Sequence, residues 1–405
     1  MNVVFLAPHY PPEMQQYTRG LAEVGARVFG VGDTPVSHLP RSVKRHLSDY
    51  LQVPRILDED DVVRRVHYWL RGREVDRILA NWEVLVLTAA KLRERCGIPG
   101  MSVDTVMGFR DKQLMKERVE AAGLRVPKST RVRTKAQAQA AAKDIGYPLI
   151  LKPIAGAGSA DTYRVNNADE LHKVLAAMGH VEEASCEEFI EGEEFTFDTI
   201  CVDGKPVYMN IAQYLPRPLI ARTTESLSPI IITVRDLDQE KYAAGIELGK
   251  NVLDALNMGD GFTHMEWFLT NKGEAIFCEI GCRPGGAHLV DQMNYTSDVD
   301  LFREWARACC WKDFRGSTER KYNAAIIFKR AKGQGRITRI EGLREFMARY
   351  GQYVTEEHLL PVGVHRRNWR QTLTSDGHII LRHPDWERTK ELAELAADMI
   401  TMYAE

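Results

Sequence analysis

The chain has 405 residues, of which 44% are hydrophobic, and this is enough for two or three domains with buried cores. Its 54 basic and 56 acidic residues give a net charge of −2, so there is no electrostatic reason to expect binding to nucleic acid or to an anionic membrane. The longest apolar runs are only as long as a strand, so we expect no transmembrane segment.

The N-terminal residues and the cysteines favour a cytoplasmic protein. Residues 1–7 lack the basic region of a signal peptide, and Pro8 ends their apolar run. The seven cysteines are odd in number and scattered, and no two of them have C-x-x-C spacing. We therefore expect free thiols in a reducing compartment and no zinc site.

The first third of the chain alternates strands and helices. An apolar strand over 3–7, a helix over 12–24 that stops at Gly25, and a strand over 27–31 form a βα beginning. A helix over 58–70, a strand over 77–80 and a helix over 83–95 continue it. Residues 1–105 therefore predict a doubly wound α/β domain. Its first βα turn has no glycine fingerprint, which disfavours a nicotinamide-binding domain.

Residues 106–185 predict a compact α+β unit. Thr134 is a good N-cap for a helix over 135–145, and Asn167 for a helix over 168–178. Between these helices lies an apolar strand that ends on Lys152, then a loop of small residues and a strand over 163–165. A further helix is expected over 111–122.

The remaining sequence predicts mainly β-strands, and it divides into two parts. Residues 186–315 predict a core subdomain, in which Asp203-Gly204 is a hairpin turn and 215–229 is a loop. Its strands and helices are expected over 186–190, 194–201, 207–213, 237–256 (helix), 262–269, 275–280 and 299–310 (helix). Residues 316–405 predict a small C-terminal α+β subdomain, with strands over 324–328, 335–340, 353–354 and 379–382 and a closing helix over 386–403.

The loop after Lys152 has the composition of a phosphate-binding loop. Gly156, Gly158 and Ser159 would let backbone N–H groups approach an anion, and Lys152 would add a positive charge. The loop fits neither the P-loop pattern nor G-x-G-x-x-G. An ordinary turn after a strand with a lysine explains the same residues, so both interpretations stay open on this stretch alone.

Two glutamates lie on neighbouring strands of the last predicted hairpin of the core. Glu266 and Glu279 both have apolar neighbours, and two buried carboxylates need a cation between them. Mg²⁺ prefers such oxygen ligands and keeps nucleotide phosphates as further ligands. Alternatively, one carboxylate faces solvent and the other pairs with Arg283 or a lysine. The lysines and the glycine loop upstream favour the metal.

An acidic stretch over 187–194 has two apolar residues at its centre. Phe189 and Ile190 indicate a partly buried segment, which could offer backbone groups to an adenine edge and a carboxylate to ribose hydroxyls. The simpler alternative is a solvated strand end, which most charge runs are.

The order of these motifs over residues 105–290 resembles that of the ATP-grasp superfamily. The motifs are Asp111-Lys112 before a helix, Tyr-Pro-Leu-Ile-Leu-Lys-Pro before the glycine loop, Glu-Glu-Phe-Ile-Glu-Gly-Glu-Glu-Phe, and a late glutamate followed by Glu-Ile-Gly-Cys-Arg-Pro-Gly-Gly. The resemblance implies that two lysines and the glycine loop hold ATP phosphates and that the acidic stretch holds adenine and ribose. It also implies that two glutamates bind Mg²⁺ and that an arginine orients the substrate carboxylate or acyl phosphate. In this chain those residues are Lys112, Lys152, Gly156, Gly158, Ser159, Glu187, Phe189, Ile190, Glu194, Glu266, Glu279 and Arg283.

The activity implied by the resemblance is an ATP-dependent carboxylate–amine ligase. It would form an amide bond through an acyl phosphate and release ADP and phosphate. The implied cofactors are ATP and Mg²⁺, or Mn²⁺ in its place, and the partners are a small carboxylate, such as an amino acid, and an amine. We expect Lys152 and Arg283 to act in catalysis, the glycine loop to open and close over ATP, and no nucleic-acid or membrane partner; a homodimer is compatible.

Several points stay open in the sequence. Gly281 stands where the family commonly has an Asn as a further metal ligand, so the number of metal ions is open. The same departure supports a rival hypothesis, an ATP-binding module without catalysis, and a thiol or other acceptor is an alternative to the amine. The loop over 215–229 lines the substrate cavity or lies on the surface. His264 and His288 flank the metal motif, but we assign neither to catalysis.

Overall fold

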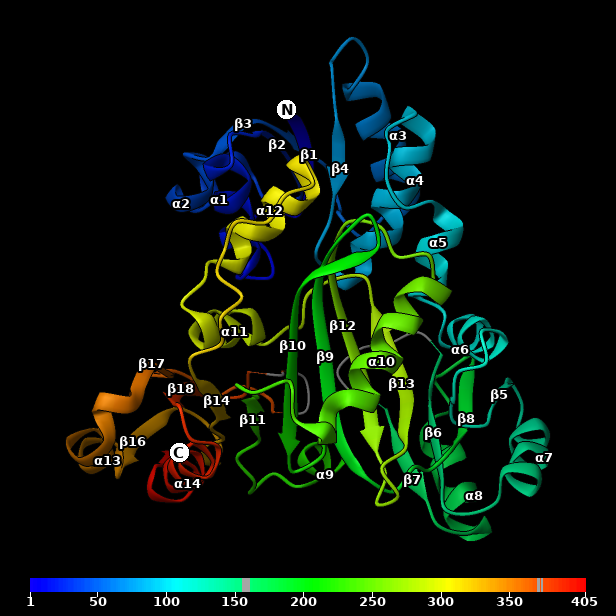
Figure 1. Ribbon diagram of the computed structural model, residues 1–405, viewed down its shortest axis with the longest axis vertical. Coiled ribbons are helices and arrows are strands. Elements are labelled where there is room, and N and C mark those ends of the chain that lie inside the picture. The colour runs from blue at the N-terminus through cyan, green and yellow to red at the C-terminus, as the bar shows by residue number, and fades with distance from the viewer. Residues whose placement is uncertain (155–160, 370–371, 373) are drawn as a thin grey trace.

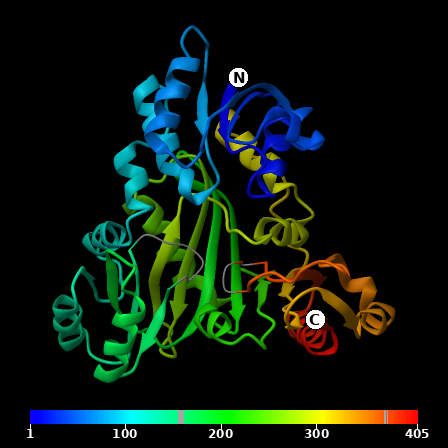
Figure 2. The ribbon, with the colours of Figure 1, turned by 180° about the vertical axis from the view of Figure 1, so that it is seen from behind.

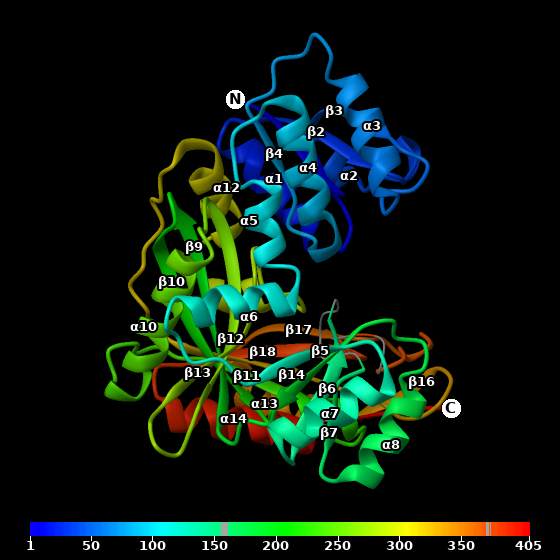
Figure 3. The same cartoon turned by 90° about the vertical axis from the view of Figure 1, so that its right-hand side faces the viewer.

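The computed structural model describes residues 1–154, 161–369, 372 and 374–405. The strands of this described part form four sheets. Figure 1 shows an N-terminal unit at the top, a long central sheet below it, a small sheet on one side and the C-terminal segments on the other. The same arrangement is seen from behind in Figure 2 and from the side in Figure 3. Within the described residues, no helix is both long and apolar enough to span a bilayer.

The N-terminal unit is a parallel α/β sheet, as the alternating pattern predicted. Its strand order is β3-β2-β1-β4, with both neighbours of β1 parallel to it. The strands are β1 (Asn2–Leu6), β2 (Arg27–Gly32), β3 (Leu47–Gln52) and β4 (Arg77–Leu79). The helices are α1 (Met14–Glu23), α2 (Arg41–Lys44), α3 (Glu59–Trp69), α4 (Val86–Cys96) and α5 (Val103–Gly108).

A helix from much later in the chain packs against the N-terminal unit. Helix α12 (Leu301–Trp311) lies beside α1 in Figures 1 and 2. The ring of Tyr17 lies 4.9 Å from that of Phe302 and 5.0 Å from that of Trp305. Arg19 pairs with Asp300 at 2.8 Å, next to these rings. Burial of these aromatic rings joins the N-terminal unit to the central part of the protein.

The central sheet is antiparallel, with strand order β13-β12-β9-β10-β11-β14-β18-β17 within the described chain. Helix α10 (Glu240–Ala255) approaches it closely because Gly245 and Gly249 face the sheet. A Cβ at Gly245 would lie 2.2 Å from the Trp267 ring, so only glycine fits there. The strands are β9 (Glu193–Val202), β10 (Lys205–Leu215), β11 (Ile230–Thr233), β12 (Gly261–Leu269), β13 (Ala275–Gly281), β14 (Asn323–Phe328), β17 (Val354–Leu359) and β18 (Gly377–His383).

The small antiparallel sheet has the strand order β5-β8-β6-β7. The predicted caps are confirmed, because Thr134 forms a capping box and Asn167 accepts from the Glu170 N–H. The elements are β5 (Ser129–Val132), β6 (Leu149–Pro153), β7 (Tyr163–Val165), β8 (Ala184–Glu188), α6 (Lys112–Ala121), α7 (Lys135–Ile145) and α8 (Ala168–Ala177).

The last strands of the central sheet come from the C-terminal segments, where a second small sheet also forms. Strands β14, β18 and β17 extend the central sheet, so it crosses the boundary expected at residue 316. The second small sheet has the order β15-β19-β16. The elements are β15 (Lys332–Gly333), β16 (Ile337–Glu341), β19 (Thr401–Ala404), α13 (Leu343–Tyr350) and α14 (Trp386–Met399). The four-domain division stays a prediction.

Two local predictions are wrong, and some elements were not predicted. The closing helix ends at Met399 rather than Tyr403, because Thr401–Ala404 pairs with β16 as strand β19. The loop over 215–229 contains helix α9 (Pro218–Thr223), which Pro218 begins at the N1 position. The elements not predicted include helix α11 (Leu289–Ser297), helix α13 and the strands β3 and β11. The overall class is confirmed: an α/β and α+β protein with a doubly wound N-terminal domain.

Candidate active site

A cavity between the small sheet and the central sheet collects most of the predicted site residues. We call it the first cavity. Its wall on the small-sheet side includes Lys152 from β6 and Glu187 from β8, and its wall on the central sheet includes Glu194 from β9, Glu266 from β12 and Glu279 from β13. The predicted residues that line it are Lys112, Lys152, Glu187, Phe189, Ile190, Glu194, Glu266 and Glu279.

The two predicted phosphate lysines meet at one carboxylate. Lys112, from the start of α6, lies 3.0 Å from Oε2 of Glu279, and Lys152 lies 3.8 Å from the same oxygen. Burial would raise the pKa of Glu279, but the charges of Lys112 and Lys152 lower it to about 2. Glu279 is therefore ionised at neutral pH, next to two ammonium groups that share one side of the cavity.

Glu187 holds two lysines by ion pairs inside the protein. Its carboxylate lies 3.1 Å from Lys152 and also pairs with Lys116. Burial opposes the charge of Glu187, but the two lysines hold its pKa well below the usual range. The side chain therefore faces lysines, whereas the resemblance implied an adenine contact for this segment. Lys116 was missed; its sequence signal is its position one helical turn after Lys112 on α6.

The two predicted metal ligands are direct partners across neighbouring strands. Glu266 of β12 is in register with Glu279 of β13, which brings both carboxylates to one face of the sheet. The Tyr214 hydroxyl donates to Oε1 of Glu266 at 3.0 Å, and Nε2 of His264 lies 3.8 Å from that oxygen. Tyr214 also carried no sequence motif, because its role depends on the pairing of distant strands.

His264 is held by a buried carboxylate. Its Nδ1 lies 2.6 Å from Oδ1 of Asp198. Burial lowers the pKa of His264, but the Asp198 charge and hydrogen bond outweigh this and raise it to about 9. His264 is thus a cation at neutral pH beside Glu266. Its ring is held in place by Asp198 and lies beside the Glu266 carboxylate.

Arg217 covers the part of the first cavity that was predicted to bind adenine and ribose. Its Nε lies 3.1 Å from Oε2 of Glu194, and its Nη1 donates to the Ile190 carbonyl at 3.0 Å. The guanidinium also lies 5.2 Å from the ring of Phe189. Burial, and then the charge of Glu266, raise the pKa of Glu194 to about 7, and the charge of Arg217 opposes this rise.

A second cavity adjoins the first. Both are lined by Pro218, Glu266 and Glu279, which therefore form a shared wall. Arg283 lines only the second cavity. The segment over 215–229 contributes residues to the walls of both cavities, and its role in substrate binding stays a prediction. The other residues of the second cavity are Tyr214, Pro216, Ala221, Arg222, Pro229, Ile230, Ile231, His264, Gly286, Ala287, Leu289, Phe328, Arg330 and Thr372.

Arg283 is oriented by a glutamate of the N-terminal unit. It pairs through Nε with Glu83, which also pairs with Arg110. Burial would raise the pKa of Glu83, but the two arginines lower it. A Cβ at Gly281 would lie 3.4 Å from both the Arg283 Nε and a Glu83 oxygen. The space that an Asn side chain would need at residue 281 is thus bordered by this ion pair.

Neither the expected loop residues nor His288 are among the described residues that line these two cavities. Gly156, Gly158 and Ser159, with the expected opening and closing of their loop, lie outside the described residues. His288 follows Ala287, which lines the second cavity, but His288 itself does not line it and pairs with Asp291 at 2.9 Å. The remaining predicted residues meet at the two adjoining cavities, and their assigned roles stay predictions.

The donor set of the first cavity fits a nucleotide and a hard divalent cation. The paired carboxylates of Glu266 and Glu279 offer oxygen ligands, as Mg²⁺ requires. Lys112 and Lys152 place two cations beside them for phosphate oxygens. Phe189 and Phe268 give the same cavity apolar surface for a base. Carboxylates, ammonium groups and aromatic rings thus occur together, as binding of a metal–nucleotide complex demands.

The sequence of this region matches a known domain family. The family model described as an ATP-grasp domain matches residues 145–291, which include Lys152, Glu187, Glu194, Glu266 and Glu279. Residues 145–291 are therefore similar to an ATP-grasp domain, as the order of the motifs implied.

Two curated relatives from Bacillus subtilis are ligases. The chain is 28% identical over 245 residues to the L-arginine-specific L-amino acid ligase, a match that covers 59% of this chain and 58% of that protein. It is 28% identical over 269 residues to an alanine–anticapsin ligase, covering 60% of this chain and 56% of that protein. The matched part thus spans less than two thirds of the length of both relatives.

Solved structures resemble the whole chain. An L-amino acid ligase from Bacillus licheniformis aligns with a TM-score of 0.79 and 19% identity, over 100% of this chain and 98% of that one. An N5-carboxyaminoimidazole ribonucleotide synthetase from Thermotoga maritima aligns with a TM-score of 0.74 and 20% identity, over 100% and 99%. The arrangement of all the parts, from the N-terminal sheet to the C-terminal segments, is therefore shared with these two structures.

Proposed function

We propose that the protein is an ATP-dependent carboxylate–amine ligase that releases ADP and phosphate. The observation that carries the proposal is the meeting of Lys112, Lys152 and Glu279 at one point, with Glu266 beside Glu279 and Arg283 across the shared wall. Cations for phosphate, carboxylates for a metal and an arginine for a second anion are the groups that phosphoryl transfer to a carboxylate needs. The names of the curated relatives and the ATP-grasp domain support the same activity.

Each side chain has a physical task in this proposal. Lys112 and Lys152 neutralise phosphate oxygens, and Glu187 keeps the Lys152 ammonium in place. Glu266 and Glu279 would hold Mg²⁺, or Mn²⁺ in its place. When bound, the metal supplies charge neutralisation at the transferred phosphoryl group. Phe189 and Ile190 would contact the base, and Glu194 would contact the ribose.

The second cavity is proposed to bind the carboxylate substrate. Arg283 can hold a carboxylate with two parallel hydrogen bonds, which a lysine cannot do. Glu83 fixes the direction of Arg283 and so the direction of the bound carboxylate. Since Glu266 and Glu279 line both cavities, a carboxylate on Arg283 lies across this wall from the phosphate side.

The lining of the second cavity supports an amino acid as the substrate. Beyond the arginines Arg222, Arg283 and Arg330 it has the apolar side chains of Ile230 and Ile231. A small acid with an apolar side chain suits such a lining. The relatives named for L-arginine, and for alanine and anticapsin, are amino-acid ligases and support this substrate class. The partners are then small molecules, a carboxylate and an amine.

The test is ATP turnover with Mg²⁺ and a panel of amino acids, in pairs and with hydroxylamine as the acceptor. We expect ADP and phosphate in equal amounts, dependent on one carboxylate, and a hydroxamate when hydroxylamine replaces the amine. Release of AMP would contradict the mechanism. ATP binding by calorimetry without turnover on any pair would favour the non-catalytic module. Turnover with thiols alone would identify a different acceptor.

A further inference from the structure

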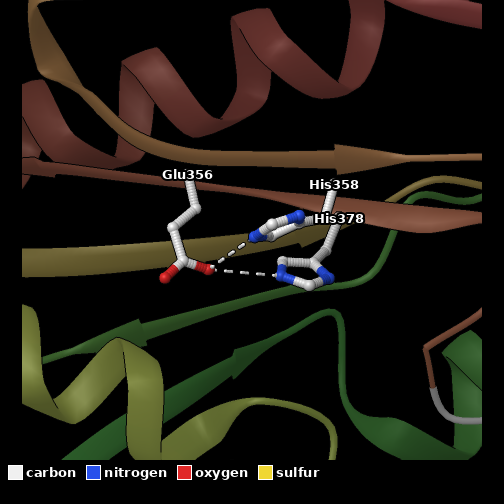
Figure 4. A group of neighbouring side chains, drawn as sticks. All are labelled: Glu356, His358 and His378. Carbon is white, nitrogen blue, oxygen red and sulfur yellow. Dashed lines mark ion pairs between the residues drawn. The ribbon is translucent and has the colours of Figure 1, made fainter. Parts of the chain in front are cut away.

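A second group of ligand-type side chains lies at the edge of the central sheet, apart from the two carboxylates of the first cavity. Glu356 and His358 lie on the edge strand β17, and His378 lies on its neighbour β18 (Figure 4). His358 is in register with His378, and Glu356 is two residues before His358 on the same strand. Residues two apart on a strand share one face, so the sheet itself brings the three side chains together.

The ligand atoms of this group have the spacing of a metal site. Oε2 of Glu356 lies 3.4 Å from Nε2 of His358 and 3.7 Å from Nε2 of His378. All three ligand atoms lie within 4.8 Å of one another. Around a tetrahedral Zn²⁺ with bonds of roughly 2.0 to 2.2 Å, neighbouring ligand atoms are about 3.3 to 3.6 Å apart. The observed separations need only small side-chain movements to reach that geometry.

The buried nitrogen of His378 gives independent evidence of a missing partner. His378 is 3% exposed, and its Nε2 has no hydrogen-bond partner among the described residues. A buried polar atom without a partner costs roughly 1 to 3 kcal/mol. This atom points toward Oε2 of Glu356 (Figure 4), at a distance too long for a hydrogen bond. A cation between these two atoms would satisfy both.

The carboxylate of Glu356 is already oriented by a neighbour. The Tyr295 hydroxyl donates to Oε1 of Glu356 at 2.6 Å. This hydrogen bond leaves Oε2 as the oxygen that faces both imidazoles. Support of a ligand by a second hydrogen bond is a regular feature of metal sites, where it fixes the direction of the ligand atom.

We propose that Glu356, His358 and His378 bind a divalent transition-metal ion, with Zn²⁺ as the best match. Two imidazoles and one carboxylate favour Zn²⁺ over Mg²⁺, which prefers oxygen ligands. Three protein ligands leave one position for water, and the exposed side chain of His358 provides the access. The site uses none of the cysteines, whose spacing was the reason not to expect zinc. It also does not depend on the proposed ligase activity.

The position of the site suggests what a bound metal would do to the structure. It would link the edge strand β17 to β18, and, through Tyr295, to helix α11. His378 is also in register with Phe328 of β14, which lines the second cavity, and its ring lies 4.5 Å from that of His288. Metal binding would thus stiffen the strands next to the second cavity.

The experiment is a Zn²⁺ titration of the full chain by calorimetry, after removal of metals with a chelator and with Mg²⁺ in excess. Excess Mg²⁺ occupies oxygen-ligand sites, so that Zn²⁺ reports the histidine site. We expect one Zn²⁺ per chain, and binding at least about 10-fold weaker in the variants Glu356→Gln and His358→Ala. The controls are Glu357→Gln, which alters an exposed neighbour on β17, and His172→Ala, which removes an exposed histidine elsewhere.

Co²⁺ used in place of Zn²⁺ identifies the ligands by visible absorption. We expect the spectrum of a four-coordinate ion without thiolate charge-transfer bands, lost in both site variants and kept in both controls. Both variants change partly exposed side chains and leave buried His378 in place, so folding is preserved. Equal Zn²⁺ affinity in the wild-type chain and the two variants, or thiolate bands in the Co²⁺ spectrum, would overturn the proposal.

Discussion

Lys112 and Glu279 form an ion pair with 3.0 Å between Nζ and Oε2, although they come from the start of α6 and from strand β13. Lys152, from a third element, lies 3.8 Å from the same oxygen. One carboxylate thus fixes the relative positions of both lysines that we assign to phosphate binding. The same carboxylate is one of the two proposed metal ligands, so its charge serves both groups.

The change Glu279→Gln keeps the shape of this side chain and removes its charge. The variant loses a metal ligand and the partner of two lysines, and we expect kcat for ATP turnover to fall by about 100- to 1,000-fold. Steady-state ADP release measures this loss, and circular dichroism with thermal unfolding checks that the fold is kept.

The matched control for this change is Glu274→Gln. Glu274 directly precedes strand β13, which carries Glu279. It is exposed and lines neither cavity. Its rate should stay within about 2-fold of wild type, since surface substitutions have small effects. A near-normal rate in Glu279→Gln would show that the metal and phosphate assignments are wrong.

Lys116 and Lys152 provide a second comparison, because both pair with Glu187 but only Lys152 lines the first cavity. We expect Lys152→Met to reduce kcat/KM for ATP by about 100-fold or more. In Lys116→Met, Glu187 keeps Lys152 as its partner, and the main loss is about 1 to 3 kcal/mol of unfolding free energy. Steady-state kinetics and urea unfolding of both variants separate the two effects. Equal losses of turnover would refute the distinction between them.

Local sequence signals predicted much of the fold. Thr134 and Asn167 cap their helices as expected, because the capping hydrogen bonds join residues three apart in the sequence. Two of the missed elements lack such signals. Helix α11 begins after His288, which has a φ of 62° and makes no side-chain cap. Strand β19 is defined by its pairing with β16, which no pattern within 386–403 could reveal.

The residues of the candidate site also differ in whether a sequence motif predicted them. Lys152, Glu187 and Glu279 belong to motifs with a recognisable order, so the sequence predicted that they meet, and they line one cavity. Lys116 was missed, and Arg217 was expected only as part of the loop over 215–229, because the partners of both come from other elements. Which oxygen or ring a long side chain reaches depends on packing between sheets, and a single sequence does not contain that distance.

The change Arg283→Lys tests the proposed carboxylate site. Lysine keeps the charge but cannot form two parallel hydrogen bonds, nor hold Glu83 in the same direction. We expect KM for the carboxylate substrate to rise by about 10- to 100-fold, with KM for ATP nearly unchanged. Initial rates over a grid of both substrate concentrations give the two constants.

Arg110→Lys is the control for this variant. Arg110 pairs with the same Glu83 but lies outside the second cavity, so a smaller rise in KM for the carboxylate is expected. If instead both variants raised KM for ATP and left that for the carboxylate unchanged, Arg283 would belong to the nucleotide site.

Buried Lys329 makes stability depend on pH in the alkaline range. Its side chain is 3% exposed with Nζ near the Ala397 carbonyl, and burial lowers its pKa from 10.5 to about 8. Between these two values the unfolded chain binds more protons than the folded protein. The free energy of unfolding therefore rises as the pH increases from about 8 to 10.5. Lys329 alone contributes about 2 to 4 kcal/mol to this rise.

The change Lys329→Met removes this titration. Urea unfolding at a pH below and at a pH above this interval gives the unfolding free energy of both proteins. From the lower to the higher pH, the wild type should gain about 2 to 4 kcal/mol relative to the variant. Taking the difference cancels the other groups that titrate in this range. Lys272→Met, which changes an exposed lysine in the turn before β13, should show almost no shift. A constant difference across the interval for Lys329→Met would mean that Lys329 titrates alike in the folded and unfolded states.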